Sequence, residues 1–298
     1  GGDAYNIWRS YNYVHVAAAN WALYRLARNN PGLVKNHPWQ WYLDHAWRAG
    51  YVMATDPQVG YDETGQMEGT VYIEILKDLL REGMNEEAAQ FEAAMKARAD
   101  HWNSLDYPFG SEMAWDSTGQ EEVHGWCKYF GYHDKAAVTL SAILGYMPTV
   151  PHWGYNGNAW RYWDFQYGGK IRRIERQIHH YGSGMNAIPV LAAYRDQPED
   201  FYLLRVGYGG ATGPLSNIDP EGFASCAFHS RPDTMTWDAY SGDYGPGFLG
   251  HAMTIATYVV RHPDLGWLAF GGNLREDEGR VSVQTLDSFR RRVYVAPM

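Results

Sequence analysis

Apolar residues recur at three- and four-residue spacing through the first half of the chain, and polar or Gly-containing links separate the periodic stretches. This spacing gathers apolar side chains on one side of an α-helix. Short links are typical of antiparallel neighbours, so we expect the helices to pair as hairpins. The pattern predicts six helices here, over residues 7–26, 38–54, 66–81, 86–102, 120–130 and 135–146.

The second half keeps a weaker helical rhythm, interrupted by stretches of polar and aromatic residues at 179–184 and 237–244 that we expect to be loops. The last stretch alternates apolar and polar residues at 267–270, 280–284 and 291–295, which is typical of strands. We therefore expect a helical domain over residues 1–262 and a short β-rich segment over 263–298. The weaker helices are predicted at 160–165, 172–181, 185–194, 199–206 and 248–260.

A short sequence occurs twice, as TGQME at residues 64–68 and as TGQEE at residues 118–122. The copies lie 54 residues apart, about the length of one hairpin with its loops, and each precedes or opens a predicted helix. A repeat of this kind indicates repeated architecture. We expect each copy to place a carboxylate in a first helical turn, at the rim of a shared cavity.

The composition favours a carbohydrate ligand. Lys and Arg total 25 against 34 Asp and Glu, so the formal charge of -9 argues against nucleic acid and against an anionic membrane surface. The 13 Trp and 23 Tyr suit half-wet surfaces, and their rings can stack on sugar rings. No apolar run approaches the roughly 20 residues that span a bilayer, and no leader opens the chain.

Residues 107–126 concentrate carboxylates and aromatic rings, the side chains that glycoside hydrolysis uses. Burial beside Trp would raise the pKa of one carboxyl group toward the acid role, while helix N–H groups would keep another ionised. Alternatively, the helical glutamates only complement helix dipoles. The candidates are Glu112 or Glu121 as acid, Glu122 or Asp116 as base, Glu68 as an alternative partner, and Trp115, His124 and Trp126 as sugar contacts.

A second aromatic cluster, at residues 151–164, is predicted to form the binding wall of the same cleft. Core packing is the alternative for its two helical tryptophans. Adjacent His179 and His180 point in different directions on a helix and make a poor metal pair. We find no cofactor or metal motif, and predict neither. The predicted sugar contacts are Trp153, Tyr155, Trp160, Trp163 and Asp164, with His180, Asp238 and Tyr240 from further loops.

The hairpin rhythm, the repeated TGQxE and the segment SEMAWDSTGQEEVHGW resemble the six-hairpin glycosidase superfamily, and more closely an uncharacterised group of such domains in large secreted microbial proteins. The resemblance implies a mainly α fold, an (α/α)6-type toroid, with carboxylates on the loops before inner helices and a secreted or periplasmic location. The chain departs from the pattern in its second half, where six hairpins cannot be counted.

The sequence therefore predicts a glycoside hydrolase that acts on a poly- or oligosaccharide. One alternative is a polysaccharide lyase on a similar toroid, which removes a proton beside a uronate with a Tyr or His base. Arg9, Asn12, Tyr13 and His15 offer the residue types that a lyase needs, although a buried amphipathic helix would explain them too. The other alternative is a non-catalytic glycan-binding domain.

Overall fold

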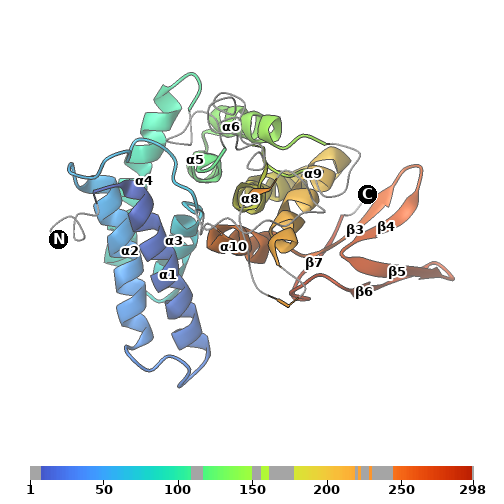
Figure 1. Cartoon of the computed structure of the whole chain (residues 1–298), viewed down its shortest axis with the longest axis horizontal. Helices are drawn as coiled ribbons and strands as arrows, with labels where there is room; N and C mark the ends of the chain where they lie inside the picture. The colour runs from blue at the N-terminus through green and yellow to red at the C-terminus, as the bar shows by residue number, and fades with distance from the viewer. Residues whose placement is uncertain are drawn as a thin grey trace. The chain divides into compact units, whose positions relative to one another are not determined.

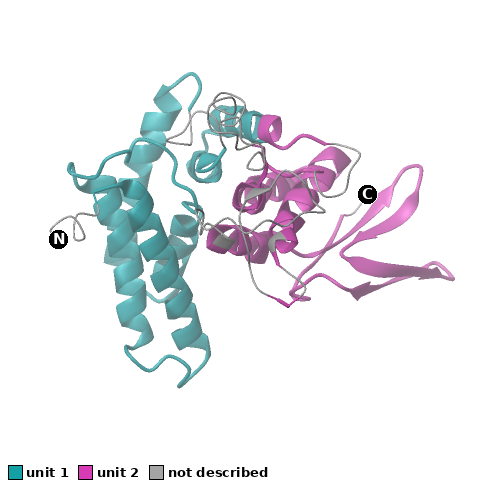
Figure 2. Ribbon diagram, viewed as in Figure 1, with its two compact units in different colours: residues 1–143 teal, residues 144–298 magenta. Residues whose placement is uncertain are grey.

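The computed structural model describes residues 8–108, 117–149, 156–160, 178–218, 221–222, 228–229 and 244–296. The chain forms two compact units, residues 1–143 and 144–298 (Figure 2). Its described part is mainly helical, with nine α-helices and small sheets near the C-terminus (Figure 1). The described residues do not show a closed ring of helices. The toroid and the domain boundary at residue 262 stay predictions.

The first four helices follow the predicted hairpin plan. The helix α1 (Ser10–Asn29) packs along α2 (Trp39–Thr55). The helices α3 (Val71–Arg81) and α4 (Asn85–Ser104) pack together and are joined by a turn at Gly83, where φ is 75°. The apolar faces of the four helices form a core that includes Val14, Leu43 and Phe91, all 0% exposed. The six predicted helices are present as α1 (Ser10–Asn29), α2 (Trp39–Thr55), α3 (Val71–Arg81), α4 (Asn85–Ser104), α5 (Gln120–Tyr129) and α6 (His133–Tyr146).

One glycine allows the close packing of α2 on its neighbours. A Cβ atom at Gly50 would lie 2.7 Å from Tyr72 Cε1 and 2.9 Å from Phe91 Cε2. The rings of Tyr72 and Phe91 fill the space that a side chain at residue 50 would need. Larger residues there would push α2 away from α3 and α4.

In the second unit, α8 (His180–Asp196) packs against α9 (Phe201–Thr212) and α10 (Tyr244–Thr254). The prediction of a loop at 179–184 is wrong for most of that stretch, because α8 begins at His180 and continues through both glycines. The glycines serve close packing instead. A Cβ atom at Gly184 would lie 2.5 Å from the carbonyl oxygen of Gly247.

The C-terminal strands begin earlier than the sequence pattern predicts. The predicted helix at 248–260 ends at Thr254, and the rest of it belongs to β3 (Thr257–His262). The residues Thr257, Tyr258, Val259 and Val260 are β-branched or aromatic and favour a strand. The strands β3, β4 (Gly266–Phe270) and β7 (Val293–Val295) form a sheet in the order β4-β3-β7. The strands β5 (Gly272–Asp277) and β6 (Arg280–Thr285) form a two-stranded sheet. Two short strands, β1 (Ile178–His179) and β2 (Phe228–His229), pair with each other.

Candidate functional site

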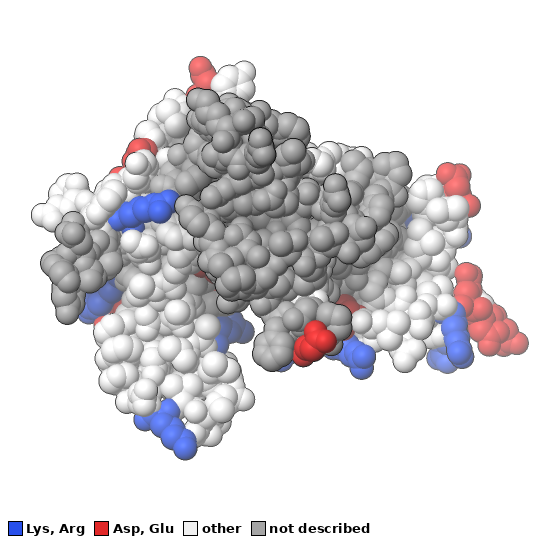
Figure 3. Space-filling view, in the orientation of Figure 1, with Lys and Arg blue, Asp and Glu red and all other residues white. Residues whose placement is uncertain are grey.

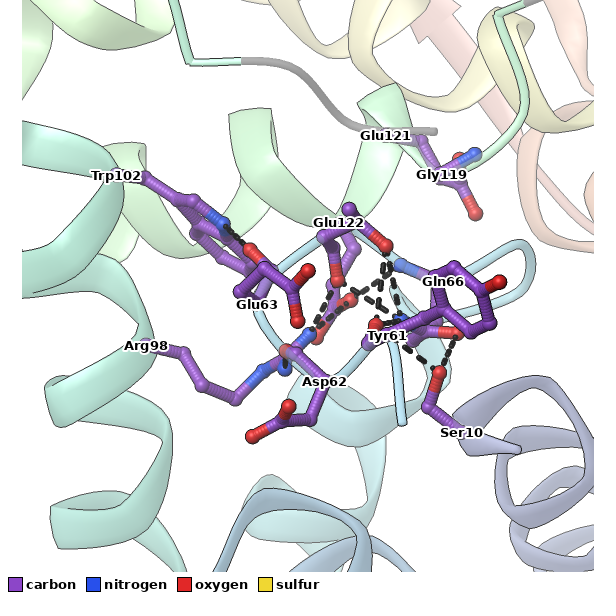
Figure 4. Close-up of polar contacts among 11 residues, drawn as sticks. Ser10, Tyr61, Asp62, Glu63, Gln66, Arg98, Trp102, Gly119, Glu121 and Glu122 are labelled. Carbon is purple, nitrogen blue, oxygen red and sulfur yellow. Dashed lines mark hydrogen bonds and ion pairs between the residues drawn. The ribbon is translucent and has the colours of Figure 1, made fainter. Parts of the chain in front are cut away.

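The two copies of the repeated sequence lie against each other in the first unit (Figure 4). The backbone N–H of Gln66, in the first copy, donates a hydrogen bond to Oε2 of Glu122, in the second copy, over 2.6 Å. Next to the first copy, Gly69 leaves room for the same side chain, because a Cβ there would lie 2.5 Å from Glu122 Cγ. The repeat therefore forms one polar cluster from residues that are far apart in the sequence.

The first copy departs from the prediction in its backbone. The helix α3 begins at Val71, so Glu68 precedes the helix and is not in its first turn. Glu68 has φ 70°, a left-handed conformation that is uncommon for a residue with a side chain. In the second copy, Glu121 and Glu122 do lie in the first turn of α5.

Glu122 forms a buried ion pair with Arg98 of α4. Arg98 Nη2 lies 2.8 Å from Glu122 Oε2, and the two residues are 7% and 0% exposed. Burial raises the pKa of Glu122, and the Arg98 guanidinium and the Gln66 N–H limit the rise. Arg98 also donates hydrogen bonds to the backbone carbonyls of Asp62 and Thr64 (Figure 4). This network fixes the loop that carries Gln66.

Glu121 has a different environment from its neighbour. It is 1% exposed, and its Oε2 accepts a hydrogen bond from the backbone N–H of Gly119 over 3.0 Å. Its Oε1 has no hydrogen-bond partner within the described ranges. Burial raises the pKa of Glu121 to about 8, and the charge of Glu122 adds to the rise. Glu121 is therefore mostly protonated at neutral pH and can donate a hydrogen bond.

Glu68 orients a more accessible imidazole. His15 Nδ1 lies 2.5 Å from Glu68 Oε2, and their side chains are 30% and 7% exposed. An Nδ1–H that donates to the carboxylate leaves the lone pair of Nε2 available as a base. One turn earlier on the same face of α1, the Tyr11 ring packs edge-on against His15 with centroids 4.4 Å apart. The Arg9 guanidinium lies 4.8 Å from the centre of the Tyr11 ring.

Three other predicted site residues of the first unit are buried or half-buried. Trp126 is 0% exposed and stacks on Phe130, so its ring packs in the core, and its contact with sugar stays a prediction. His124 is buried and its Nδ1 lies 3.0 Å from the Ala136 carbonyl oxygen. Tyr13 is half-buried, and this burial raises the pKa of its phenol.

His180 and Trp160 belong to the second unit. His180 is 0% exposed, with Nδ1 3.2 Å from Asn158 Oδ1 and Nε2 3.3 Å from Ser216 Oγ. Trp160 pairs with Ile178 in a β-bridge, so the helix predicted to begin at residue 160 does not include it. These contacts place His180 in a buried polar network that links α8 to residues 213–217.

Nine predicted site residues, from both predicted walls of the cleft and from the loop at 237–244, lie outside the described residues. No group of three or more His, Cys, Asp or Glu in the described ranges is arranged to hold a metal ion. Among the helices that the structure describes, none is long and apolar enough to span a membrane. The nine residues are Glu112, Trp115, Asp116, Trp153, Tyr155, Trp163, Asp164, Asp238 and Tyr240.

Three residues of this site were not predicted from the sequence: Gln66, Arg98 and Tyr11. The sequence does indicate that Arg98 is buried, since it lies at helical spacing from Met95 and Trp102 on the buried face of α4. An arginine at an apolar position is rarely buried without a partner. The backbone donor at residue 66 had no such signal.

Comparison with known proteins identifies a family and a fold. A family model described as "Family of unknown function (DUF5695)" matches residues 2–298. No curated protein matches the chain. A solved structure titled "Polysaccharide Lyase BACCELL_00875" is similar, with a TM-score of 0.62 and 17% sequence identity, over 85% of this chain and 37% of that one. The chain thus spans little more than a third of the length of that lyase, and the likeness is one of fold.

Proposed function

The chain belongs to the DUF5695 family, whose function is unknown, and we propose that it is a carbohydrate-active domain that cleaves an acidic polysaccharide by elimination, as a lyase does. The observation that carries the proposal is the accessible His15 imidazole, held by the buried Glu68 carboxylate at 2.5 Å. The likeness of fold to a polysaccharide lyase supports the same class of reaction.

In this reaction, His15 Nε2 takes the proton from the sugar carbon beside the uronate carboxylate. The electron pair of that C–H bond forms a C=C double bond, and the glycosidic C–O bond on the next carbon breaks. The leaving oxygen takes up the proton that the imidazolium carries. A general base of this kind contributes about 10²–10⁴-fold to the rate. Glu68 fixes the tautomer and stabilises the imidazolium, as an acidic partner of histidine does.

The uronate carboxylate must be neutralised for its neighbouring carbon to release a proton. Arg9, at the start of α1 and stacked over Tyr11, offers a cation on the same side of the helix as His15. The local cation matters because the chain has a net charge of -9, which repels an acidic polymer at long range. Arg9 would therefore contribute to substrate binding more than to the proton transfer.

A second candidate is the glycoside hydrolase predicted from the sequence. The observation that favours it is the pKa of Glu121, which burial raises to about 8 and which suits a general acid. Its base would come from Glu68, from Glu122 or from carboxylates outside the described residues. Glu122 is the weaker choice, since its Oε2 already accepts from Arg98 and Gln66.

The two candidates give different products from the same assay. The protein is incubated with a panel of uronate-containing and neutral polysaccharides, while reducing ends and the ultraviolet absorbance of unsaturated sugars are followed together. We expect both signals to rise together on a uronate polymer. Reducing ends without new absorbance would establish the hydrolase instead, and no product from any polymer would overturn the proposal.

With an active substrate, the base is tested by substitution. We expect His15→Ala to lower kcat by about 10²–10⁴-fold, and Glu68→Gln to lower it less, because the amide still orients the ring. The matched control is His101→Ala, on the exposed surface of α4, which should leave turnover unchanged. Full activity in His15→Ala, with circular dichroism confirming the fold, would refute this assignment of the base.

A further inference from the structure

A cleft opens between the β4 strand and the β5–β6 hairpin of the second unit, outside the proposed catalytic site. Its volume is about 810 Å³, which is within the range of small-molecule binding sites. One side is formed by Trp267 and Leu268 of β4. The other side is formed by the hairpin, including Asn273, Arg275 and Gln284.

The polar side chains of this cleft have unused hydrogen-bonding capacity. In the register of the hairpin, Asn273 lies opposite Gln284 and Arg275 opposite Ser282, so these four share one face. The side chains of Asn273, Arg275 and Gln284 are exposed and make no hydrogen bond or ion pair within the part of the chain that the structure describes. Amide and guanidinium groups of this kind can bind the hydroxyl and carboxylate groups of a ligand.

Trp267 adds an aromatic surface to these polar groups. It is half-buried, and its ring makes no aromatic or cation–π contact with the residues that the structure describes. Leu274 and Val283, directly opposite each other in the hairpin, alternate with these polar residues and lie on its other face, so the apolar side chains beside the ring are those of Leu268 and Ala269 on β4. An amphipathic ring beside free amide groups suits a ligand with apolar C–H faces and hydroxyl edges, which is the chemistry of a sugar.

The charge of the cleft is local and positive. Arg275 is the one charged residue among those that line it. The acidic residues Glu276, Asp277 and Glu278 lie instead at the turn end of the hairpin, where Figure 3 shows acidic side chains beside basic ones. An acidic sugar would therefore meet a guanidinium in the cleft.

We propose that the cleft is a second oligosaccharide-binding site, which holds the substrate polymer away from the reacting bond. A sugar ring would lie on Trp267, its hydroxyls would bind Asn273 and Gln284, and a uronate carboxylate would bind Arg275. The class of ligand rests on the proposed function. The cleft itself is built from residues that take no part in the reaction.

The test measures binding separately from cleavage. The 298-residue chain carrying His15→Ala is titrated with uronate-containing and neutral polysaccharides by affinity electrophoresis and calorimetry. We expect Trp267→Ala to weaken binding roughly tenfold, since it removes both the stacking surface and its buried area. Leu265→Ala is the matched control, because Leu265 lies in the turn before β4 and is 67% exposed outside the cleft. It should leave binding unchanged.

Arg275→Ala, with Arg280→Ala on the same hairpin as its control, tests the charge. We expect Arg275→Ala to weaken binding of the uronate polymer and to spare binding of a neutral one. Unchanged affinity in both Trp267→Ala and Arg275→Ala, or no binding of any polysaccharide, would overturn the proposal. Binding that depends on Trp267 without cleavage would support the cleft and refute the lyase, whereas cleavage with binding indifferent to Trp267 would do the reverse.

Discussion

Replacement of Glu121 by glutamine tests the electrostatics of the cluster most directly. Burial raises the pKa of this carboxyl group to about 8, from 4.5 for a free glutamate. Between those two pH values, the folded protein keeps a proton that the unfolded chain has released. The free energy of unfolding should then fall as pH rises, by about 1.4 kcal/mol per pH unit and by about 5 kcal/mol over the window.

The sign follows from which state binds the proton. The contribution of Glu121 is fully present below pH 4.5 and is lost as pH rises through about 8. Glutamine has a similar shape and cannot titrate, so Glu121→Gln should lack this dependence. We therefore expect the unfolding free energy of the wild type, minus that of Glu121→Gln, to fall by about 3 kcal/mol from pH 5 to pH 7.

Urea unfolding of both proteins at pH 5, 6 and 7 measures this difference, and carboxyl ¹³C NMR of the folded proteins reads the titration itself. Glu86→Gln, on an exposed part of α4, is the matched control and should run parallel to the wild type. A difference between wild type and Glu121→Gln that stays constant from pH 5 to pH 7 would show an ionised Glu121. Burial would then not keep the Glu121 carboxyl group protonated at neutral pH.

Two further changes probe the packing of the same cluster. Arg98→Met should lower the unfolding free energy by about 3–5 kcal/mol, because it leaves the Glu122 carboxylate buried without a cation. Adding Glu122→Gln should restore part of the lost stability in thermal melts. If it restores none, the broken ion pair is not the cause of the loss. Gly69→Ala should cost about 1–3 kcal/mol through its clash with Glu122. Gly145→Ala, where a Cβ meets nothing within 4 Å, should stabilise α6 by about 0.5–1 kcal/mol, and equal effects at the two glycines would contradict the packing argument.

Most helices of the first unit could be predicted because they have one buried and one exposed side, although α5 is buried nearly all round. The end of α10 could not, because residues 255–260 are all buried and show no periodicity. Their conformation depends on pairing, since β3 bonds to β4 on one side and to β7, more than thirty residues later, on the other. A fully buried apolar run carries no information about which of these long-range partners it will find.

The site was predictable in its residue types and only partly in its geometry. The repeated sequence indicated that residues 64–68 and 118–122 belong together, and the bond from Gln66 N–H to Glu122, across 56 positions, joins them. The left-handed backbone of Glu68 had no signal, because Met67 and Glu68 are ordinary in a helix. The pairing of His15 with Glu68, across 53 positions, depends on how α1 packs beside that loop.

The choice between elimination and hydrolysis depends on which groups of the cluster remain available to a substrate. Of the three carboxylates in its described part, Glu122 is committed to Arg98 and Glu68 to His15, and Glu121 is protonated and 1% exposed. Hydrolysis needs two carboxyl groups that reach the sugar. The imidazole of His15, with 30% of its side chain exposed, can reach it without breaking a buried ion pair. This difference in accessibility is why we expect a proton to be removed from the sugar rather than water to be added.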